Sequence, residues 1–513
     1  MRTPARAWAL AALSGVLLFF SFPKFGHGGV AFVALAPLLV ALHGAGFGAG
    51  FRLAYLTGFV SSLGLLYWTS LVVVQYGGLG LPLGVAAMLL LCLAFSLFHG
   101  LFGGLVGRFS SRFGPAGLLL APPAWVACEL LRTHTLFRFA WCLLGYSQAD
   151  HESWIQVAAY TAVYGVSFLV CLASAAIAYV LLETRPRARL RVGLAVAALL
   201  GAAWGFGRWR LSQPVPETGR VRVGLVQADI RQEDKWDAGL LLDNLERHLA
   251  LTRQAADRGA RLVVWPESAV PYYFDRDPVV AEPLRELARS RSLYLLFGND
   301  DTDAAPGASR RIWVGAKLLS PRGELVLRYH KMRLVPFGEY TPLEGLLGLG
   351  GRFTARLVQA VGRFVPGTEY SVGPLDGHRL SVLICYEAIF PDLVREFTRR
   401  GSELLVNVTN DAWYGRTSAP FQHFAMARFR AVENGRYLVR AANTGITAVV
   451  DPRGRVLERT SLFVPAVVVR DVGFVSEQTF YARHGDLFAW ACLGAVLALA
   501  ATTLRAAPRN VPG

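Results

Sequence analysis

The sequence predicts a polytopic α-helical membrane bundle of about eight spans, joined to one α/β domain. Three observations support this fold class. Only 17% of the 513 residues are charged and 53% are hydrophobic, whereas a soluble domain carries about 25% charged residues. Long apolar runs occupy the chain before about residue 206 and after about residue 486. The stretch between them has an ordinary globular composition, in which strand-like and helix-like patterns alternate.

The apolar runs are long enough to be membrane spans, since a spanning helix needs roughly 20 mostly apolar residues. A single run of this kind is also typical of a buried core helix, but several in succession joined by short polar loops are not. The first run is followed by no small-residue cleavage pattern, so we expect an uncleaved span rather than a signal peptide. The predicted spans are Trp8–Phe22, Gly28–Leu42, Leu53–Val74, Leu81–Val106, Ala116–Leu131, Trp154–Leu182, Val192–Phe206 and Leu487–Leu504.

The arginines predict the orientation of this bundle, because cytoplasmic loops carry an excess of Lys and Arg. If the N-terminus is cytoplasmic, the arginine-rich segments (for example Arg185 to Arg191) all fall on the cytoplasmic side. Residues 1–206 then form the N-terminal bundle, residues 207–486 form a domain on the far side of the membrane, and residues 487–513 return to the cytoplasm. The formal charge of +16 is therefore partly a topology signal. The central domain shows no clustered basic face, so we expect no nucleic-acid partner.

Cysteine usage singles out one residue. All of the six cysteines except Cys385 lie within or beside the apolar runs, where a cysteine is usually a small hydrophobic residue. No second cysteine of the central domain is available for a disulfide with Cys385. A lone thiol in this domain is either inert and buried or a nucleophile, and the cysteine count alone does not decide between them.

The central domain alternates strands and helices, which predicts an α/β layered fold with helices covering the sheets. The predicted strands are Val221–Ala228, Arg261–Trp265, Leu293–Phe297, Ile312–Leu318, Glu324–Tyr329, Arg379–Ile384 and Glu403–Val408, with several more between Tyr437 and Val469. The predicted helices are Trp236–Arg258, Pro278–Ser290, Phe390–Arg400 and Ala419–Asn434. Catalytic side chains in such folds gather where strands end. Glu267, Lys331 and Cys385 all occupy such positions.

These three residue types form a complete set for acyl transfer. A thiol attacks as thiolate and needs a base or a positive field, and Glu267 can take its proton. Lys331 can stabilise the oxyanion that forms at an attacked carbonyl, together with backbone N–H groups after Cys385. Each residue also has an ordinary structural explanation, as a loop-end carboxylate, a surface lysine and a core cysteine. The sequence contains no glycine-rich phosphate loop and no His/Cys cluster at metal-ligand spacing, so we predict neither cofactor nor metal.

Several motifs in this order resemble the nitrilase superfamily and, more narrowly, its membrane branch, the apolipoprotein N-acyltransferases. The motifs are Trp265-Pro266-Glu267, His330-Lys331 with Leu334–Tyr340, Ile384-Cys385-Tyr386-Glu387, Thr409–Gly415 and Gln422–Gly445. The resemblance covers nearly the whole chain and implies a nitrilase-like αββα sandwich domain behind seven spans and before one. One segment departs from the family pattern: Arg138-Phe139-Ala140-Trp141 stands where a Gly-aromatic-Pro-Trp run is expected.

The resemblance implies a two-step reaction in the inner membrane of a bacterium, with the catalytic domain on the periplasmic side. Cys385 would take an acyl chain from a phospholipid, phosphatidylethanolamine above all, and pass it as a thioester to the N-terminal amine of a diacylglyceryl-modified apolipoprotein. It gives Glu267 the role of base and Lys331 that of electrophilic stabiliser. The resemblance also implies that four further residues support the active site: Glu339, Tyr386, Glu387 and Trp236. We expect a monomer.

Two alternatives and one segment remain open at this point. A membrane-anchored amidase or nitrilase would use the same three residues, and its substrate would need no bundle of spans. A transporter or scaffold would need more intramembrane charges than these spans contain, of which Glu129 is the clearest. The segment Thr341–Phe364 mixes leucines, glycines and arginines, and is either a lid at the membrane interface or an amphipathic insertion packed on the domain.

Overall fold

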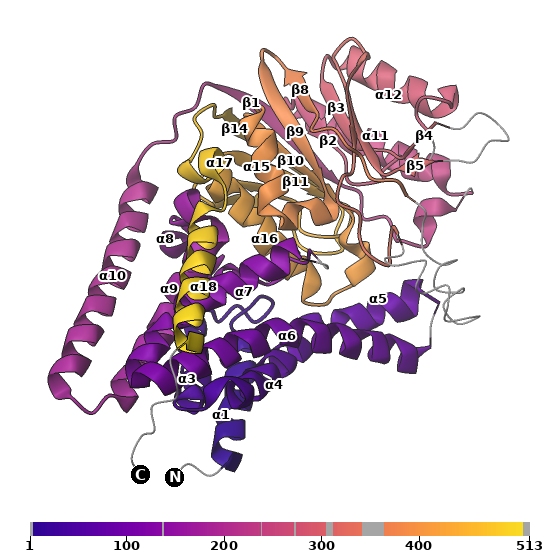
Figure 1. The fold of residues 1–513 in the computed structure, drawn as a ribbon. Coiled ribbons are helices and arrows are strands. Elements are labelled where there is room, and N and C mark those ends of the chain that lie inside the picture. Colours follow the sequence, from indigo (N-terminus) through magenta and orange to yellow (C-terminus); the bar gives the residue numbers. More distant parts are fainter. Residues whose placement is uncertain are drawn as a thin grey trace. The chain divides into compact units, whose positions relative to one another are not determined.

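The computed structural model describes residues 4–78, 80–135, 138–237, 239–270, 273–303, 311–340 and 364–505. The chain divides into two compact units. The first unit contains Met1–Leu71, Gly80–Pro214 and His484–Gly513, and the second contains Val72–Leu79 and Val215–Arg483. Figure 1 shows that the first is helical and that the second contains the strands.

The first unit consists of helices whose length and composition suit a membrane. Within the described residues, four stretches are long and apolar enough to cross one: Gly46–Leu66, Leu81–His134, Ala158–Leu182 and Pro186–Ser212. Three shorter apolar helical stretches accompany them, at Ala5–Phe20, Gly28–Leu42 and Leu487–Thr503. The helices are α1 (Pro4–Phe20), α2 (Ala31–Ala34), α3 (Ala36–Leu42), α4 (Gly46–Leu66), α5 (Trp68–Tyr76, which continues into the second unit), α6 (Leu81–Phe113), α7 (Ala121–His134), α8 (Glu152–Ile155), α9 (Ala158–Leu182), α10 (Pro186–Ser212) and α18 (Leu487–Arg505).

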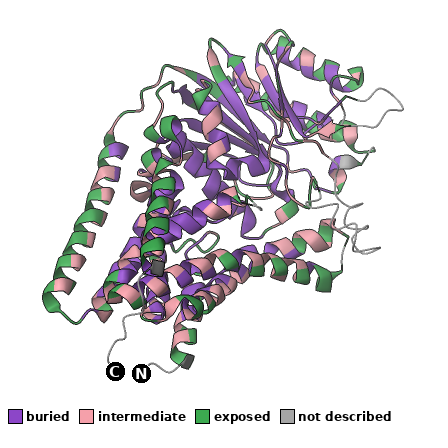
Figure 2. Ribbon diagram, in the orientation of Figure 1, coloured by how far each residue is buried: buried purple, intermediate pink, exposed green. Residues whose placement is uncertain are grey.

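Large apolar residues are exposed along these helices, and Figure 2 colours much of α10 as exposed. Only 6% of the most apolar stretch of α10 is buried inside the protein. Leu190 and Leu194 on this helix are 63% and 61% exposed. A soluble protein rarely exposes a contiguous apolar surface of this kind, so the chain is a membrane protein.

The helices begin and end at other residues than most of the predicted spans, as α6 and α9 illustrate. The span predicted at Leu81–Val106 continues as α6 to Phe113 and ends where Gly114 adopts a φ of +62° ahead of Pro115. A left-handed glycine is a common helix terminator, and periodicity alone does not locate it. The span predicted at Trp154–Leu182 begins later, because the short helix α8 (Glu152–Ile155) precedes α9 as a separate element.

The second unit contains two six-stranded sheets with the orders β14-β1-β2-β3-β6-β7 and β13-β12-β11-β10-β9-β8. In the first sheet β1, β2 and β3 are parallel, and in the second β9, β10 and β11 are parallel. The first sheet contains β1 (Gly219–Gln227), β2 (Leu262–Val264), β3 (Tyr294–Gly298), β6 (Gly315–Leu319), β7 (Leu325–His330) and β14 (Ala466–Phe474). The second contains β8 (Val372–Leu375), β9 (His378–Ile384), β10 (Leu404–Thr409), β11 (Tyr437–Ala442), β12 (Ala448–Val450) and β13 (Val456–Arg459). A separate pair is formed by β4 (Asp301–Thr302) and β5 (Ile312–Trp313).

Helices cover both sheets, and the sheets contact each other through β1 with β11 and β6 with β9. Helices α11 (Leu241–Asp257) and α12 (Pro278–Ser290) pack on the first sheet, and α15 (Pro391–Arg399) and α16 (Ala419–Asn434) lie beside the second (Figure 1). Every residue of β2, β10 and β11 is buried, as expected for central parallel strands covered on both faces. The parallel strands run in one direction within each sheet, so the residues that follow β9 and β10 emerge at the same sheet edge.

The helix predicted at Trp236–Arg258 was too long at its start. A short 3-10 helix, η4 (Asp234–Trp236), comes first, and α11 begins only at Leu241. Between them the Asp237 carboxylate accepts the N–H of Gly239 at 2.8 Å. Local side-chain bonds of this kind compete with the helix ladder.

Candidate active site

Cys385 lies at the end of the buried strand β9, at the first position of the 3-10 helix η6 (Cys385–Ile389). Its side chain is buried and its backbone adopts a φ of +51°. A left-handed φ is uncommon for a residue other than glycine and costs about 1–3 kcal/mol. The surrounding structure therefore holds this cysteine in a strained turn, which directs its side chain away from the line of the strand.

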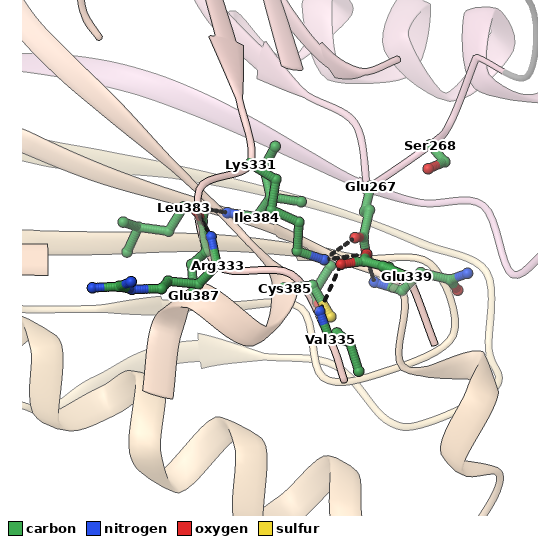
Figure 3. A network of polar contacts seen from close by, with 12 residues as sticks. Glu267, Ser268, Lys331, Arg333, Val335, Glu339, Leu383, Ile384, Cys385 and Glu387 are labelled. Carbon is green, nitrogen blue, oxygen red and sulfur yellow. Dashed lines mark hydrogen bonds and ion pairs between the residues drawn. The ribbon is translucent and has the colours of Figure 1, made fainter. Parts of the chain in front are cut away.

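Lys331 and two carboxylates meet the thiol in a buried cluster (Figure 3). Lys331 Nζ donates to Glu267 Oε1 at 3.1 Å and to Glu339 Oε1 at 2.6 Å. Lys331 follows β7 and is 0% exposed, and Glu267 follows β2 and is 6% exposed. The loop between Lys331 and Glu339 folds back on itself, because Glu339 Oε2 accepts the N–H of Val335 at 2.8 Å. The ammonium is thus fixed between two carboxylates.

Glu267 is held from three directions. Its second oxygen, Oε2, accepts the backbone N–H of Asn410 at 3.0 Å, from the end of β10. Its carbonyl oxygen accepts Lys235 Nζ at 2.8 Å, and Lys235 is itself only 5% exposed. The next residue, Ser268, has a φ of +46°. The turn that carries Glu267 is therefore strained but anchored to both sheets.

The Glu387 carboxylate accepts hydrogen bonds both from the residue before Cys385 and from the residues after Lys331. Its Oε2 accepts the N–H of Ile384 at 2.8 Å. Its Oε1 accepts the N–H of Met332 at 2.7 Å, the N–H of Arg333 at 3.2 Å and the Tyr329 hydroxyl at 2.7 Å. One fully buried carboxylate thus fixes the ends of β7 and β9 against each other.

A second buried network supports Cys385 from the side of α16. His423 Nε2 lies 3.1 Å from the carbonyl oxygen of Cys385, and since a carbonyl only accepts, Nε2 carries the hydrogen. His423 Nδ1 lies 2.9 Å from Asp411 Oδ1, and Arg440 pairs with Asp411 Oδ2 at 2.7 Å. Cys385, Asp411 and His423 offer ligand atoms within 4.8 Å of one another, a spacing that a metal ion could use. The Asp411 oxygens and the His423 ring nitrogens already form these contacts. A structural role therefore fits them better than metal binding.

Burial dominates the electrostatics of the site. It raises the pKa of the Cys385 thiol, and Glu267 raises it further, so the resting thiol is protonated. Burial alone would lower the pKa of Lys331, but Glu267 and Glu339 together raise it well above its usual value, so the ammonium is permanent. Burial lowers the pKa of Lys235 to about 8 and raises that of Glu387 to about 7. The charged lysine and the neutral thiol are the states from which any reaction starts.

Comparison with known proteins agrees with this geometry. Residues 222–479 match the carbon-nitrogen hydrolases, and residues 14–176 match the apolipoprotein N-acyltransferase N-terminal domain. An apolipoprotein N-acyltransferase from Geobacter metallireducens is 39% identical over 510 residues, which cover 98% of this chain and 96% of that protein. One from Chlorobaculum tepidum is 33% identical over 536 residues, covering 98% and 97% respectively. The chain belongs to the apolipoprotein N-acyltransferase family. The family predicted from the motifs is confirmed.

The residues that the family resemblance selects are only partly brought together. Glu267, Lys331, Glu339 and Cys385 share one cluster, and Glu387 lies behind it. Tyr386 is buried beside the cysteine, and its ring packs edge-on against Phe390 at 5.0 Å. The side chain of Trp236 and residues 341–363 of the predicted lid lie outside the described residues. Arg138, of the divergent segment, is exposed in the helical unit with a φ of +38°.

Sequence reasoning missed several residues that support the buried cluster. Lys235 stood next to a residue that was singled out, yet nothing in its local pattern indicated burial. Asn410 and His423 lay in segments that resembled the family, but no chemistry was assigned to them. Their roles depend on which strand ends meet in space, and a single sequence does not contain that information.

Proposed function

We propose that this protein transfers an acyl chain from a phospholipid, through a thioester on Cys385, to the N-terminal amine of a diacylglyceryl-modified apolipoprotein. The observation that carries the proposal is the buried cluster of a thiol, an ammonium and two carboxylates at the strand ends. These groups supply a nucleophile, a base and an electrostatic stabiliser for acyl transfer. The name of the relatives and the exposed apolar helices agree with a lipid-linked substrate.

In the first step, Glu267 takes the proton of the Cys385 thiol as the sulfur attacks the ester carbonyl carbon of the phospholipid. The Lys331 ammonium and backbone N–H groups after Cys385 stabilise the oxyanion. The tetrahedral intermediate collapses with cleavage of the ester C–O bond. The departing lysophospholipid alkoxide receives the proton from Glu267, which leaves a thioester and an ionised carboxylate.

In the second step, the α-amine of the apolipoprotein attacks the thioester carbonyl. Glu267 takes a proton from that amine, and the C–S bond breaks to release the amide. The proton then returns to the sulfur, which restores the starting thiol. Glu267, Lys331 and Cys385 act as a triad in this scheme, with Glu339, Glu387, Tyr386 and Trp236 in support.

The membrane topology completes the proposal. The eight spans would comprise a bundle (residues 1–206) and a last helix with a cytoplasmic tail (residues 487–513) in the inner membrane, and the catalytic domain (residues 207–486) would be periplasmic. The catalytic domain would be an αββα sandwich, which the two helix-covered sheets in mutual contact support. The protein would act as a monomer on two lipid-borne substrates, without cofactor or metal.

An amidase or nitrilase that hydrolyses a small C–N bond is the second candidate, because residues 222–479 match the carbon-nitrogen hydrolases. Hydrolysis would need water in the cluster. The two chemistries differ in whether the acylated enzyme persists until an amine arrives, and this can be measured.

The test is the intact mass of the purified full chain after incubation with phosphatidylethanolamine in detergent. We expect a gain of one acyl chain that hydroxylamine removes and that the Cys385→Ala variant does not show. Adding a diacylglyceryl-cysteine peptide should discharge the adduct to the peptide amine. No adduct on a folded protein, together with release of ammonia from small amides, would replace the transferase by the amidase.

A further inference from the structure

A cavity inside the helical unit contains a buried carboxylate that the proposed chemistry does not use. Helices α1, α4, α6 and α7 line it, and Glu129 and Arg132 contribute its charged groups. Glu129 lies within a predicted span and is 5% exposed. An ionisable group at such a place is costly and usually marks a functional site.

One oxygen of Glu129 has a structural role and the other does not. Oε1 accepts the indole N–H of Trp125 at 2.9 Å and the backbone N–H of Leu144 at 2.6 Å. Among the residues that the structure describes, Oε2 has no hydrogen-bond partner although it is buried. The amide oxygen of a glutamine could accept both bonds of Oε1, so those bonds alone do not explain why the side chain is a carboxylate.

Arg132 follows Glu129 by one helical turn on α7, yet the two side chains form no direct ion pair within the described residues. In the described part of the chain Glu129 forms no ion pair within 4.0 Å, and the buried Arg132 Nε has no partner. Arg132 instead donates from its terminal nitrogen to the carbonyl of Trp141 at 3.1 Å, and its guanidinium lies 6.0 Å from the Phe95 ring centroid. Opposite charges at this helical spacing normally pair, and charges left apart in an apolar setting need another partner.

The walls of the cavity are aromatic. Phe95 stacks on Phe139 at 4.8 Å, and Phe139 stacks on Trp141 at 5.8 Å. Aromatic faces attract cations, the more so when water is excluded. The cavity therefore combines a free carboxylate oxygen and π faces, which suit a cation, with a free guanidinium N–H, which suits an anion.

The size of the cavity limits the ligand to a small group. Its volume is about 50 Å³, and a water-sized group needs about 10–15 Å³ on this measure. About four such groups fit, which corresponds to an ammonium, two methylene groups and one phosphate oxygen. The Cβ atoms of residues three apart on a helix are about 5–6 Å apart, a separation that a two-carbon spacer can bridge.

We propose that this cavity binds the zwitterionic head group of a phospholipid with a primary amine, the ammonium on Glu129 Oε2 and the phosphate on Arg132. The choice of lipid rests on the proposed function, but the site lies within the helical unit and binding there requires no chemistry at Cys385. Glu129 and Arg132 would select the lipid by its head group before or apart from acyl transfer. Phosphatidylglycerol, which has the phosphate without the amine, should bind poorly.

The test is native mass spectrometry of the full chain carrying Cys385→Ala, which prevents a covalent adduct, with phosphatidylethanolamine or phosphatidylglycerol added. We expect phosphatidylethanolamine to be retained at least tenfold better than phosphatidylglycerol. Glu129→Gln should abolish this preference, while its melting temperature stays close to that of the parent because the bonds of Oε1 remain. Glu183→Gln is the matched control: its carboxylate is buried in the same unit but occupied by Arg185 at 2.9 Å, and it should leave the preference intact.

Equal retention of the two lipids by the parent would overturn the proposal, and the cavity would then hold internal water. This result is measured on the parent alone, so it does not depend on whether a variant folds. An undiminished preference in a folded Glu129→Gln protein would overturn it too, because the selectivity would then lie elsewhere. Thioester formation is measured separately on the protein with Cys385. If no thioester forms but the Glu129-dependent preference remains, the proposed function fails and the lipid site stands.

Discussion

Replacement of Glu387 by glutamine tests whether one buried carboxylate positions both Cys385 and Lys331. The amide oxygen of the glutamine would take the place of Oε1 and keep neutral hydrogen bonds from Met332, Arg333 and Tyr329. The amide NH2 would then face the N–H of Ile384, where Oε2 now accepts at 2.8 Å. The opposite orientation would set the NH2 against three donors, so it is worse.

The cost follows from the bonds that change. A buried N–H left without an acceptor costs about 1–3 kcal/mol, and replacing a charged acceptor by a neutral one weakens the remaining bonds by about 1 kcal/mol in total. We therefore expect a loss of about 2–4 kcal/mol in unfolding free energy, or roughly 5–12 °C in melting temperature. A displacement of about 1 Å between reacting groups costs about 100-fold in rate. Thioester formation should slow by at least that factor.

The assay combines the melting temperature with the rate of hydroxylamine-labile acylation, followed by intact mass. Tyr329→Phe is the matched variant, because it removes one donor to Glu387 and leaves the carboxylate and its bond to Ile384 in place. It should acylate within about fivefold of the parent rate, in keeping with the loss of one bond of about 1–2 kcal/mol. If Glu387→Gln acylates at the parent rate with a parent melting temperature, Glu387 does not position the two strand ends.

Three further predictions follow from the site. Glu267→Gln should slow thioester formation by about 10²–10⁴-fold and lower the unfolding free energy by about 1–3 kcal/mol, because Lys331 and Asn410 donate to different oxygens and the single amide oxygen of a glutamine can accept from only one of them; an exposed control, Glu324→Gln, should acylate normally. His423→Gln should slow acylation by about tenfold or more through loss of the hydrogen bond that holds the Cys385 carbonyl, and a rate within twofold of the parent would argue against that role. Burial lowers the pKa of Lys235 to about 8 in the folded protein, so between pH 7 and 9.5 the unfolded chain binds more protons at this residue and stability rises with pH. Relative to the Lys235→Met variant, the parent should gain about 2 kcal/mol in unfolding free energy over that pH range. Parallel pH profiles of the two melting temperatures would refute the prediction that Lys235 titrates as a buried group.

The sequence predicted the reacting groups better than their surroundings. Cys385 directly follows the buried strand β9, Lys331 directly follows β7, and Glu267 follows β2 closely, so patterns that locate strand ends also locate these residues. The order and parallel direction of the strands, which bring β2, β7, β9 and β10 together at the site, depend on long-range pairing that the local pattern does not encode. The strain at Cys385 and Ser268 could not be predicted either, because neither residue is a glycine.

In the helical unit, too, the sequence predicted some features and not others. Apolar runs predicted where the membrane helices lie, but not their ends: α6 continues past the predicted Val106 to Phe113 and stops at a left-handed glycine. Glu129 was visible in the sequence as an isolated charge. That its Oε2 and the Nε of Arg132 remain unpartnered within the described residues, although the two lie one turn apart, required the side-chain positions.

The charges of the buried cluster explain how a protonated thiol can be an effective nucleophile here. At rest the Lys331 ammonium lies between the Glu267 and Glu339 carboxyl groups, in a site where Lys331 is 0% exposed. Burial disfavours the Cys385 thiolate and the neighbouring Glu267 disfavours it further, which is why the pKa of the thiol is raised. If the proton passes to Glu267 as the sulfur attacks, the negative charge moves from the carboxylate to the oxyanion and the total does not change. Lys331 contacts Glu267 in the resting state, so the same ammonium can follow the charge to the oxyanion with little reorganisation. A preformed thiolate is therefore unnecessary, and transfer of the proton during the attack is the step that this arrangement favours.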